Sequence, residues 1–229
     1  MPPFDPVRLT TLTFDCYGTL IDWETGAIEA LRPLLARHGV ALSDDGIIAV
    51  FQDLDGALCE PPYKLYRAVL AGVVEGFGQR FGFAIGAAER ELLAASLPSW
   101  RPFPDMVDAL RVLAGRFKLA VVSNIDDDLF AATAQQLGVT FNLVVTAQQV
   151  RCYKPHPAIF EEALRRLAAE PGSVAHVAEG VAEIPPARQF GCATVWVRRH
   201  RRSARLLTEA PDLEVPDLRS LLARIGVST

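Results

Sequence analysis

Five short apolar runs constrain the fold of this chain more than any other feature. They are rich in β-branched residues and predict buried strands at residues 9–14, 119–123, 143–146, 174–178 and 194–197. Segments with apolar residues at helical spacing lie between most of them, at residues 106–113, 129–137 and 159–167. This alternation is typical of a parallel sheet covered by helices on both faces. The sequence therefore predicts a doubly wound α/β core.

A long insertion separates the first two predicted strands. Residues 23–100 show helical periodicity, for example at 28–37 and 63–74, and no convincing strand. We expect a helical cap domain over 23–100, inserted into an α/β core domain formed by 1–22 and 101–229. A linker with three prolines, LPSWRPFPDM, leads back to the core. The glycines of AGVVEGFGQRFG match no dinucleotide fingerprint and are interpreted as helix-breaking.

Composition and charge exclude several classes of protein. With 229 residues, 50% hydrophobic and 22% charged, the chain is predicted to be globular. Its net charge of −4 gives no general attraction to nucleic acid or anionic membranes, and the basic run RRHRRSAR is interpreted as a solvated loop. No targeting or membrane-spanning segment is evident, so we expect a cytoplasmic protein. The four cysteines have no CxxC spacing, which argues against a disulfide framework or zinc site.

Polar residues follow four of the predicted strands. They are Asp15, the pair Ser123 and Asn124, Lys154 in the segment CYKPHP, and the acids Glu179 and Glu183. Because ligands of open parallel sheets bind beyond the carboxyl ends of the strands, we expect these side chains to lie close together. An acid, a hydroxyl, an amide, a lysine and a second acid form a plausible set for covalent catalysis by a carboxylate. Lys154 would hold Asp15 ionised by charge pairing.

These motifs resemble those of a known family. FDCYGTL, VVSNIDDD, CYKPHP and HVAEG are similar, in this order, to motifs one to four of the haloacid dehalogenase-like hydrolase superfamily, over essentially the whole chain. Phosphatases of that superfamily carry a second aspartate where this chain has Tyr17, and the DxYGT form is characteristic of its (S)-2-haloacid dehalogenases. The resemblance implies a hydrolase that displaces halide from a small 2-haloacid through an ester on Asp15, with no cofactor and no metal.

The resemblance also implies roles for other residues. Ser123 and Asn124 would bind the carboxylate of the substrate or the ester oxygens, and Tyr17 and Thr19 would lie beside the substrate. The dehalogenases carry serine, asparagine and aspartate in motif four, at positions matching Ala178, Gly180 and Glu183, so this chain retains only the acid. Glu183 is predicted to activate the water that hydrolyses the ester; support of a helix N-terminus is the structural alternative.

The cap departs from the family pattern as well. The arginine that dehalogenases place near the start of the second cap helix matches Val50. The nearest substitute donors are in the segment PPYKLYRAVL, namely Tyr63, Lys64, Tyr66 and Arg67. Of these we take Tyr63 and Tyr66 as candidate substrate-binding residues; a solvated helix face is the alternative for each.

Two other functions stay open. A magnesium-dependent phosphatase would bind the ion through Asp15, a backbone carbonyl and an acid of motif four, although Tyr17 argues against protonation of the leaving group. A non-catalytic small-anion-binding protein is the other alternative, favoured by Ala178 and Gly180. The acids at 126–128 resemble a metal cluster but are interpreted as the N-cap and first turn of a helix. The expected partner is a small anionic molecule, and a homodimer is possible.

Overall fold

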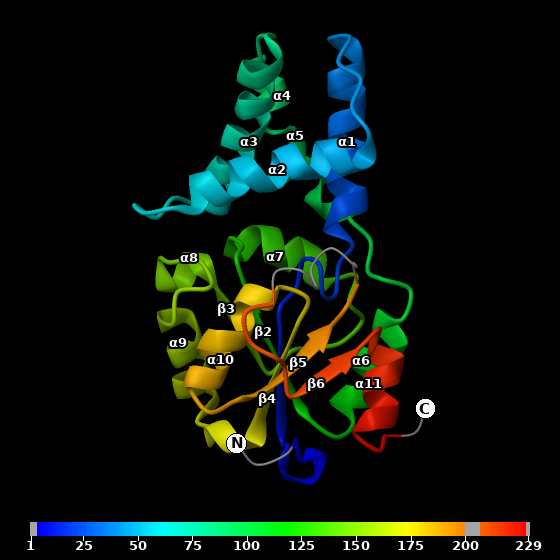
Figure 1. The fold of residues 1–229 in the computed structure, drawn as a ribbon, viewed down its shortest axis with the longest axis vertical. Coiled ribbons are helices and arrows are strands. Elements are labelled where there is room, and N and C mark those ends of the chain that lie inside the picture. Colours follow the sequence, from blue (N-terminus) through cyan, green and yellow to red (C-terminus); the bar gives the residue numbers. More distant parts are fainter. Residues whose placement is uncertain (1–3, 200–206, 228–229) are drawn as a thin grey trace.

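A parallel sheet forms the centre of the computed structural model, which describes residues 4–199 and 207–227. Its strands run in the order β3-β2-β1-β4-β5-β6 (Figure 1). The bounds are β1 Thr11–Phe14, β2 Lys118–Ser123, β3 Leu143–Thr146, β4 Val174–Ala178, β5 Ala193–Val197 and β6 Leu213–Val215. All five predicted strands are confirmed to within one or two residues. The sixth was missed because three residues are too few to show a periodicity.

Helices cover both faces of the sheet, as predicted. On one face α9 packs against β2 and β3, and α10 packs against β4 and β5. On the other, α6 packs against β2 and α11 against β6, and α7 contributes Leu129 and Phe130 to the same core. The bounds are α6 Met106–Ala114, α7 Asp127–Ala134, α8 Ala147–Val150, α9 Ala158–Leu167, α10 Ile184–Gln189 and α11 Leu218–Arg224, with short 3-10 turns at Pro6–Arg8, Leu97–Ser99, Pro171–Ser173 and Val181–Glu183. The doubly wound α/β class is therefore confirmed.

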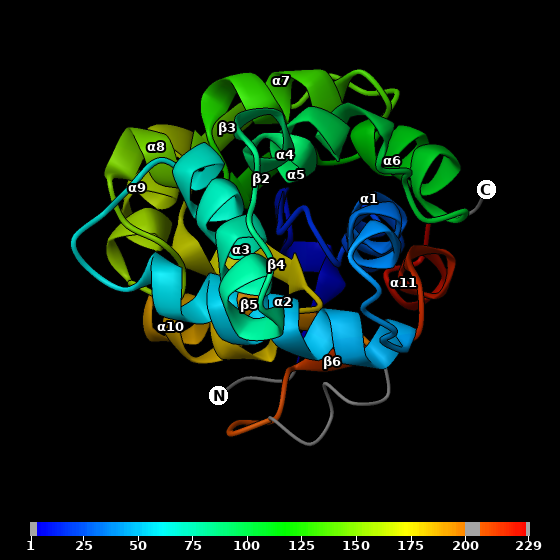
Figure 2. The same ribbon diagram turned by 90° about the horizontal axis from the view of Figure 1, so that it is seen from above.

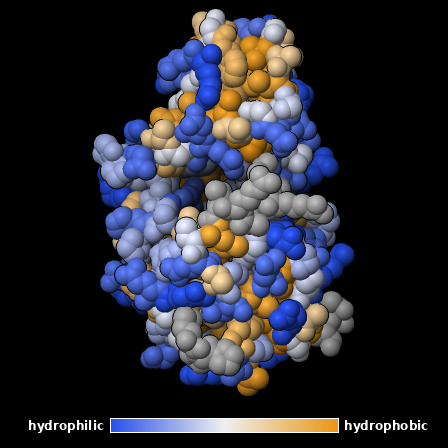
Figure 3. Space-filling model, in the orientation of Figure 1, coloured by the Kyte–Doolittle hydropathy of each residue, from blue (hydrophilic) through white to orange (hydrophobic). Residues whose placement is uncertain are grey.

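Five helices of the inserted segment stand above the carboxyl ends of the strands (Figures 1 and 2). They are α1 Trp23–Arg37, α2 Asp44–Cys59, α3 Tyr66–Phe81, α4 Ala87–Arg90 and α5 Leu92–Ser96. In the view of Figure 3, apolar side chains gather toward the top of this helical cap. The limits of the two domains, 1–22 with 101–229 and 23–100, stay a prediction. None of the described helices is long and apolar enough to cross a membrane.

The glycine-rich run ends a helix only at its last residue. Its other glycines lie inside α3, contrary to the expectation that they break a helix, whereas Gly82 ends α3 with a φ of 77°. A Cβ atom added at Gly72 would lie 2.9 Å from Leu58 Cδ1, and one added at Gly76 would lie 2.6 Å from Leu54 Cδ2. These glycines therefore let α2 and α3 pack closely, which matters because α2 carries part of the wall of the site.

The interpretation of the basic run as a solvated loop is wrong at Arg199. Its side chain is only 6% exposed, and its Nη1 donates to Asp105 Oδ1 at 2.7 Å. Its Nη2 donates to the carbonyl oxygen of Thr19 at 3.1 Å. Burial acts to raise the pKa of Asp105, but the hydrogen bonds from Arg199 and from the backbone N–H of Leu218 outweigh it and hold that pKa below its usual value. Arg199 thus holds the turn after β1 in place through the carbonyl oxygen of Thr19. Residues 200–205 of the basic run lie outside the described residues.

Candidate active site

The turn after β1 positions Asp15. The carbonyl oxygen of Cys16 accepts the backbone N–H groups of Thr19, Leu20 and Ile21, and Gly18 adopts a φ of 103° that favours glycine. This tight turn brings Thr19 Oγ1 back to donate to Asp15 Oδ2 at 2.8 Å, while it accepts the backbone N–H of Glu179 at 2.8 Å. Thr19 is fully buried. Its predicted substrate contact is untested, and in this structure its hydroxyl orients Asp15.

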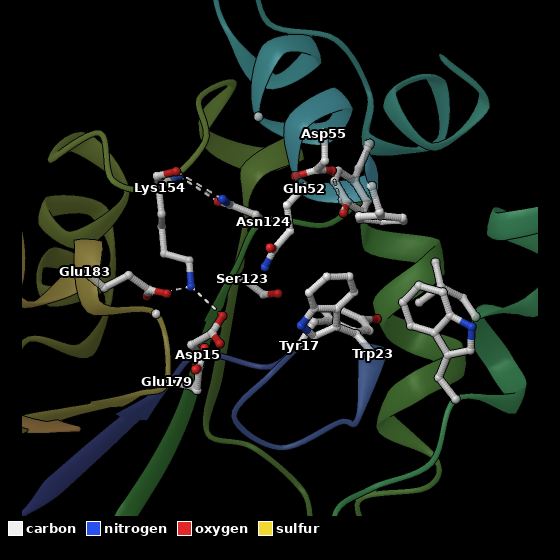
Figure 4. Close-up of a pocket in the computed structure, with 16 residues that line it drawn as sticks. Asp15, Tyr17, Trp23, Gln52, Asp55, Ser123, Asn124, Lys154, Glu179 and Glu183 are labelled. Atoms are coloured by element: carbon white, nitrogen blue, oxygen red, sulfur yellow. Dashed lines mark hydrogen bonds and ion pairs between the residues drawn. The ribbon is translucent and has the colours of Figure 1, made fainter. Parts of the chain in front are cut away.

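Lys154 joins two carboxylates at the carboxyl ends of the strands (Figure 4). Its Nζ lies 2.7 Å from Asp15 Oδ1 and 2.7 Å from Glu183 Oε2, and it donates to the carbonyl oxygen of Val122 at 2.8 Å. The Lys154 side chain is 3% exposed, so these partners replace water around the ammonium group. The structure therefore brings together the acid, the lysine and the second acid that the sequence placed at separate strand ends.

Asn124 holds the backbone of Lys154. Its Oδ1 accepts the N–H of Lys154 at 2.6 Å, and its Nδ2 donates to the carbonyl oxygen of Lys154 at 3.1 Å. The hydroxyl of neighbouring Ser123 is buried in the cavity lining and has no hydrogen-bond partner among the described residues. Of the predicted pair, Ser123 thus offers a donor to a bound molecule, whereas the Asn124 side chain is engaged in positioning Lys154.

His176 is part of the site and was not singled out from the sequence. It lies on β4 opposite Thr13 of β1. Its Nε2 is 2.9 Å from Glu183 Oε2, and its Nδ1 is 2.9 Å from Thr13 Oγ1. A polar residue in the middle of the apolar run VAHVA is the one signal that might have directed attention to it. It fixes the carboxylate of Glu183 from within the sheet.

Burial and charge act against each other in this group. Burial raises the pKa of Asp15, and the negative charge of Glu183 adds to this rise, although Lys154 and Thr19 oppose it. Burial would also raise the pKa of Glu183, but the charge of Lys154 and the hydrogen bond to His176 hold it below its usual value. Burial alone would lower the pKa of Lys154; the two carboxylates reverse this, so the lysine stays charged. Glu183 is therefore the more firmly ionised of the two acids.

An apolar wall encloses the space above Asp15. The cavity has a volume of about 450 Å³, and its apolar lining comes from Tyr17, Trp23, Phe51, Tyr66, Leu97 and Trp100. The Tyr17 ring meets the Trp100 ring edge to face at 6.0 Å, and its hydroxyl bonds to Thr133 Oγ1 at 2.8 Å. Tyr17 therefore presents its ring to the cavity and directs its hydroxyl into the core.

The cap adds polar side chains that were not predicted. Gln52 and Asp55 of α2 line the cavity, whereas Val50 lies in the hydrophobic core and does not. Tyr66, one of the two predicted cap residues, lines the cavity and donates its hydroxyl to Asp55 Oδ1 at 3.0 Å. Burial raises the pKa of Asp55 to about 6. Tyr63, the other, lines a neighbouring cavity instead.

The acidic run after Asn124 joins core and cap. Asp126 is the N-cap residue of α7 and Asp127 and Asp128 lie in its first turn, as predicted, but the Asp126 side chain makes no capping hydrogen bond to that helix. Its two oxygens accept the backbone N–H groups of Tyr66 and Arg67, each at 2.8 Å, and so cap α3. Asp128 pairs with the Arg67 guanidinium at 2.7 Å. Among the described residues, no group of three or more His, Cys, Asp and Glu side chains has the geometry to hold a metal ion.

A parallel α/β core with a helical cap over a buried, lysine-paired aspartate defines the architecture of a class of capped α/β hydrolases. The chain belongs to the haloacid dehalogenase-like hydrolase family, whose model matches residues 9–191.

Known relatives carry both dehalogenase and phosphatase names. The mouse haloacid dehalogenase-like hydrolase domain-containing protein 3 is 46% identical over 195 residues, covering 76% of this chain and 75% of that protein. The (S)-2-haloacid dehalogenase of Pseudomonas sp. (strain YL) is 27% identical over 147 residues, 63% of either chain, so the match spans less than two thirds of that enzyme. A probable phosphatase, IndB of Dickeya dadantii, is also similar.

Solved structures agree in fold. The L-2-haloacid dehalogenase from Xanthobacter autotrophicus superimposes with a TM-score of 0.80 at 23% identity, over 94% of this chain and 98% of that one.

Proposed function

We propose that this hydrolase acts on a small organic acid with a halogen at carbon 2, through an ester on Asp15. The Asp15 carboxylate attacks carbon 2, the carbon–halogen bond breaks, and halide leaves with the bonding electron pair. Water then attacks the carbonyl carbon of the ester. This releases the 2-hydroxy acid, restores the Asp15 carboxylate and frees one proton.

One observation carries this proposal: the Asp15 carboxylate, paired with Lys154, faces a cavity that has an apolar wall on one side. That wall includes the aromatic ring of Tyr17, two residues after Asp15 in the sequence. Displacement of halide from carbon needs no proton donor, because halide is stable as an anion. The apolar wall removes water from the carboxylate and so favours its attack on carbon. Hydrolysis of a phosphate ester, by contrast, requires a proton for the leaving oxygen, and the hydroxyl of Tyr17 is bonded to Thr133.

A magnesium-dependent phosphatase is the second candidate, favoured by the phosphatase named among the relatives. Its ion would need oxygen ligands from Asp15 and an acid of motif four. The position between Asp15 and Glu183 is taken by the ammonium group of Lys154, 2.7 Å from each. An ammonium group at this position does not fit a site for a divalent cation, so the proposed reaction steps include no metal ion.

The test is a turnover screen with chloroacetate, (S)-2-chloropropionate, fluoroacetate and p-nitrophenyl phosphate, with EDTA or with magnesium. We expect halide release in EDTA from at least one haloacid. Asp15→Asn should abolish it with an unchanged thermal transition, because an amide has no anionic oxygen to attack. Asp128→Asn, an exposed acid of the same chain, is the matched control and should retain activity. Phosphate release that requires magnesium, without halide release, would support the phosphatase; ligand binding without any turnover would support the anion-binding alternative.

A cytoplasmic location and a homodimer stay predictions from the sequence.

A further inference from the structure

Asp55 lies in the part of the cavity wall that the cap provides. It extends from α2 on the side of the cavity opposite Asp15, beside Gln52 (Figure 4). Its Oδ1 accepts the hydroxyl of Tyr66 at 3.0 Å, and its Oδ2 lies 4.0 Å from the Sγ of Cys59. A carboxylate can accept about four hydrogen bonds, so Asp55 can still accept contacts from a molecule in the cavity.

The Asp55 carboxylate has no cationic partner within residues 4–199 and 207–227. Burial therefore raises its pKa to about 6, and the hydrogen bond from Tyr66 opposes this rise only in part. An acid that is ionised at neutral pH in such surroundings lowers the stability of the folded protein. Residues of this kind, when they line a cavity, are typical of binding sites.

Aromatic rings line the same part of the cavity. Phe51 precedes Asp55 by four residues on α2, so the two side chains lie on one face of that helix. The Phe51 ring packs against that of Trp23 at 5.0 Å, and the Tyr66 ring carries the hydroxyl that contacts Asp55. The faces of aromatic rings attract cations, most strongly where water is excluded. An acid within such a wall is suited to bind a positively charged group.

The charges beside Asp15 favour a substrate that carries a positive charge of its own. Among the described residues that line the cavity, Lys154 is the only lysine or arginine, and its Nζ already contacts the carboxylates of Asp15 and Glu183. The carboxylate of a 2-haloacid, placed beside the hydroxyl of Ser123, adds a further negative charge, which these acids repel. A cationic group in the same molecule offsets this charge.

We propose that the substrate is a 2-haloacid whose side chain on carbon 2 ends in a positively charged group, and that Asp55 binds this group together with the rings of Phe51 and Tyr66. This rests on the proposed function: Asp15 attacks carbon 2, and the carboxylate bonded to that carbon stays at the core side of the cavity. The side chain extends from carbon 2 toward α2. A cavity of about 450 Å³ has room for such a molecule.

Binding of two unreactive acids tests the inference without turnover. The pair is 4-(trimethylammonio)butanoate and 5,5-dimethylhexanoate, which share their shape and their carboxylate and differ in the charge of the terminal group. Isothermal titration at pH 8, where Asp55 is ionised, gives the ratio of the two affinities, cationic over neutral. Asp55→Asn should lower this ratio at least about fivefold, because it removes the charge and keeps the side-chain volume.

Asp53→Asn is the matched control. It removes an acid from the surface of the same helix, where Asp53 pairs with Arg80, and should leave the ratio of affinities unchanged. A ratio that is equal in wild type and Asp55→Asn, or that falls equally in Asp53→Asn, would overturn the inference.

Chloride release from the corresponding substrates separates the inference from the proposed function. These substrates are 2-chloro-4-(trimethylammonio)butanoate and 2-chloro-5,5-dimethylhexanoate. Asp55→Asn should lower kcat/KM for the cationic substrate at least about fivefold relative to the neutral one. Chloride release from both, with a ratio of kcat/KM that is the same in wild type and Asp55→Asn, overturns only the inference. A binding ratio that depends on Asp55, without chloride release from any haloacid, overturns the proposed reaction and supports the binding of a cation by Asp55.

Discussion

Asp126, the N-cap residue of the core helix α7, accepts the backbone N–H of Tyr66 at the start of the cap helix α3, at 2.8 Å. The second oxygen of the same carboxylate accepts the next N–H, that of Arg67, also at 2.8 Å. Asp126 is only 2% exposed. A buried carboxylate that satisfies two N–H groups of a helix N-terminus fixes α3 against the core, and with it the Tyr66 side chain in the wall of the site.

We therefore predict that Asp126→Asn lowers the free energy of unfolding by about 1–3 kcal/mol, because the amide offers one acceptor oxygen for two N–H groups. KM should rise more than kcat falls, since the cap closes less completely over the substrate. Asp128→Asn is the control: Asp128 is 67% exposed and pairs with Arg67, so its loss should cost less than about 1 kcal/mol. Equal effects of the two substitutions in urea unfolding would contradict the role of Asp126.

Asp55 leads to a prediction about pH. Burial raises its pKa from 3.8 to about 6, so in this interval the folded protein holds a proton that the unfolded chain releases. The free energy of unfolding should consequently fall as the pH rises from about 4 to about 6. Asp55→Asn removes this pH-dependent loss of stability, and the side-chain oxygen of the amide can still accept a hydrogen bond from the hydroxyl of Tyr66. It should stabilise the protein at pH 8 by about 1 kcal/mol, after allowance for solvent screening, and give no gain at pH 4.

Urea unfolding at pH 4 and pH 8 measures this difference. Asp53→Asn, on the same helix and paired with Arg80 at the surface, serves as the comparison for the loss of an acid from α2. A stabilisation by Asp55→Asn that is the same at both pH values would show that the effect does not come from titration of this carboxyl.

Gly26 and Trp100 give a test of the apolar wall. A Cβ atom at Gly26 would lie 2.4 Å from Trp100 Cδ1, so Gly26→Ala must displace the indole that lines the cavity and meets Tyr17. We expect a loss of about 1–3 kcal/mol in stability from overpacking and a clear fall in kcat/KM. Gly172→Ala, where nothing lies within 4 Å of the added atom, should change stability by less than about 0.5 kcal/mol. Unchanged activity in Gly26→Ala would remove Trp100 from the functional wall.

The sequence predicts those residues of the site whose positions are set by the carboxyl ends of the strands. Asp15 directly follows β1, and Lys154 comes after β3 and the short helix α8. Parallel strands bring their carboxyl ends to one edge of the sheet, so both residues were expected at that edge. Contacts between core and cap could not be predicted in this way. That Asp126 would cap α3, or that Tyr63 would lie beside Arg151 rather than above Asp15, depends on how the inserted helices dock on the core, which periodicity within each element does not encode.

In motif four, a contact between two residues close in the sequence, Gly180 and Glu183, could not be predicted either. The sequence indicates that Gly180 replaces an asparagine and that Glu183 is one methylene longer than the aspartate of relatives, but not that the two changes are connected. In the structure a Cβ atom at Gly180 would lie 2.7 Å from Glu183 Oε1. The longer acid occupies the space that a side chain at position 180 would need. Its other oxygen is held by Lys154 and His176, so it cannot easily move away.

The last prediction concerns Glu183, for which the sequence suggests the role of the base that activates water. The structure favours a different main role. Because the charge of Lys154 and the hydrogen bond to His176 outweigh burial and hold the pKa of Glu183 low, this carboxylate is a weak base that fixes the lysine beside Asp15. Its charge also raises the pKa of Asp15. Glu183→Gln keeps the volume and removes the charge, so the pKa of Asp15 should fall.

Attack requires ionised Asp15, and activity is therefore lost as the pH falls through the pKa of that group. In Glu183→Gln the acid limb of the pH profile of the single-turnover rate should consequently move to lower pH. We also expect kcat to fall about tenfold or more, because Lys154 loses a charged partner and is held less firmly beside Asp15. Glu162→Gln, at an exposed ion pair with Arg165, should leave the acid limb and kcat unchanged.

Intact-protein mass spectrometry separates the two roles of Glu183, fixing Lys154 or activating water. We expect no ester on Asp15 to accumulate in Glu183→Gln. An accumulated ester with an unmoved acid limb would return Glu183 to the role of base, whereas accumulation in Glu179→Gln alone would assign that role to Glu179.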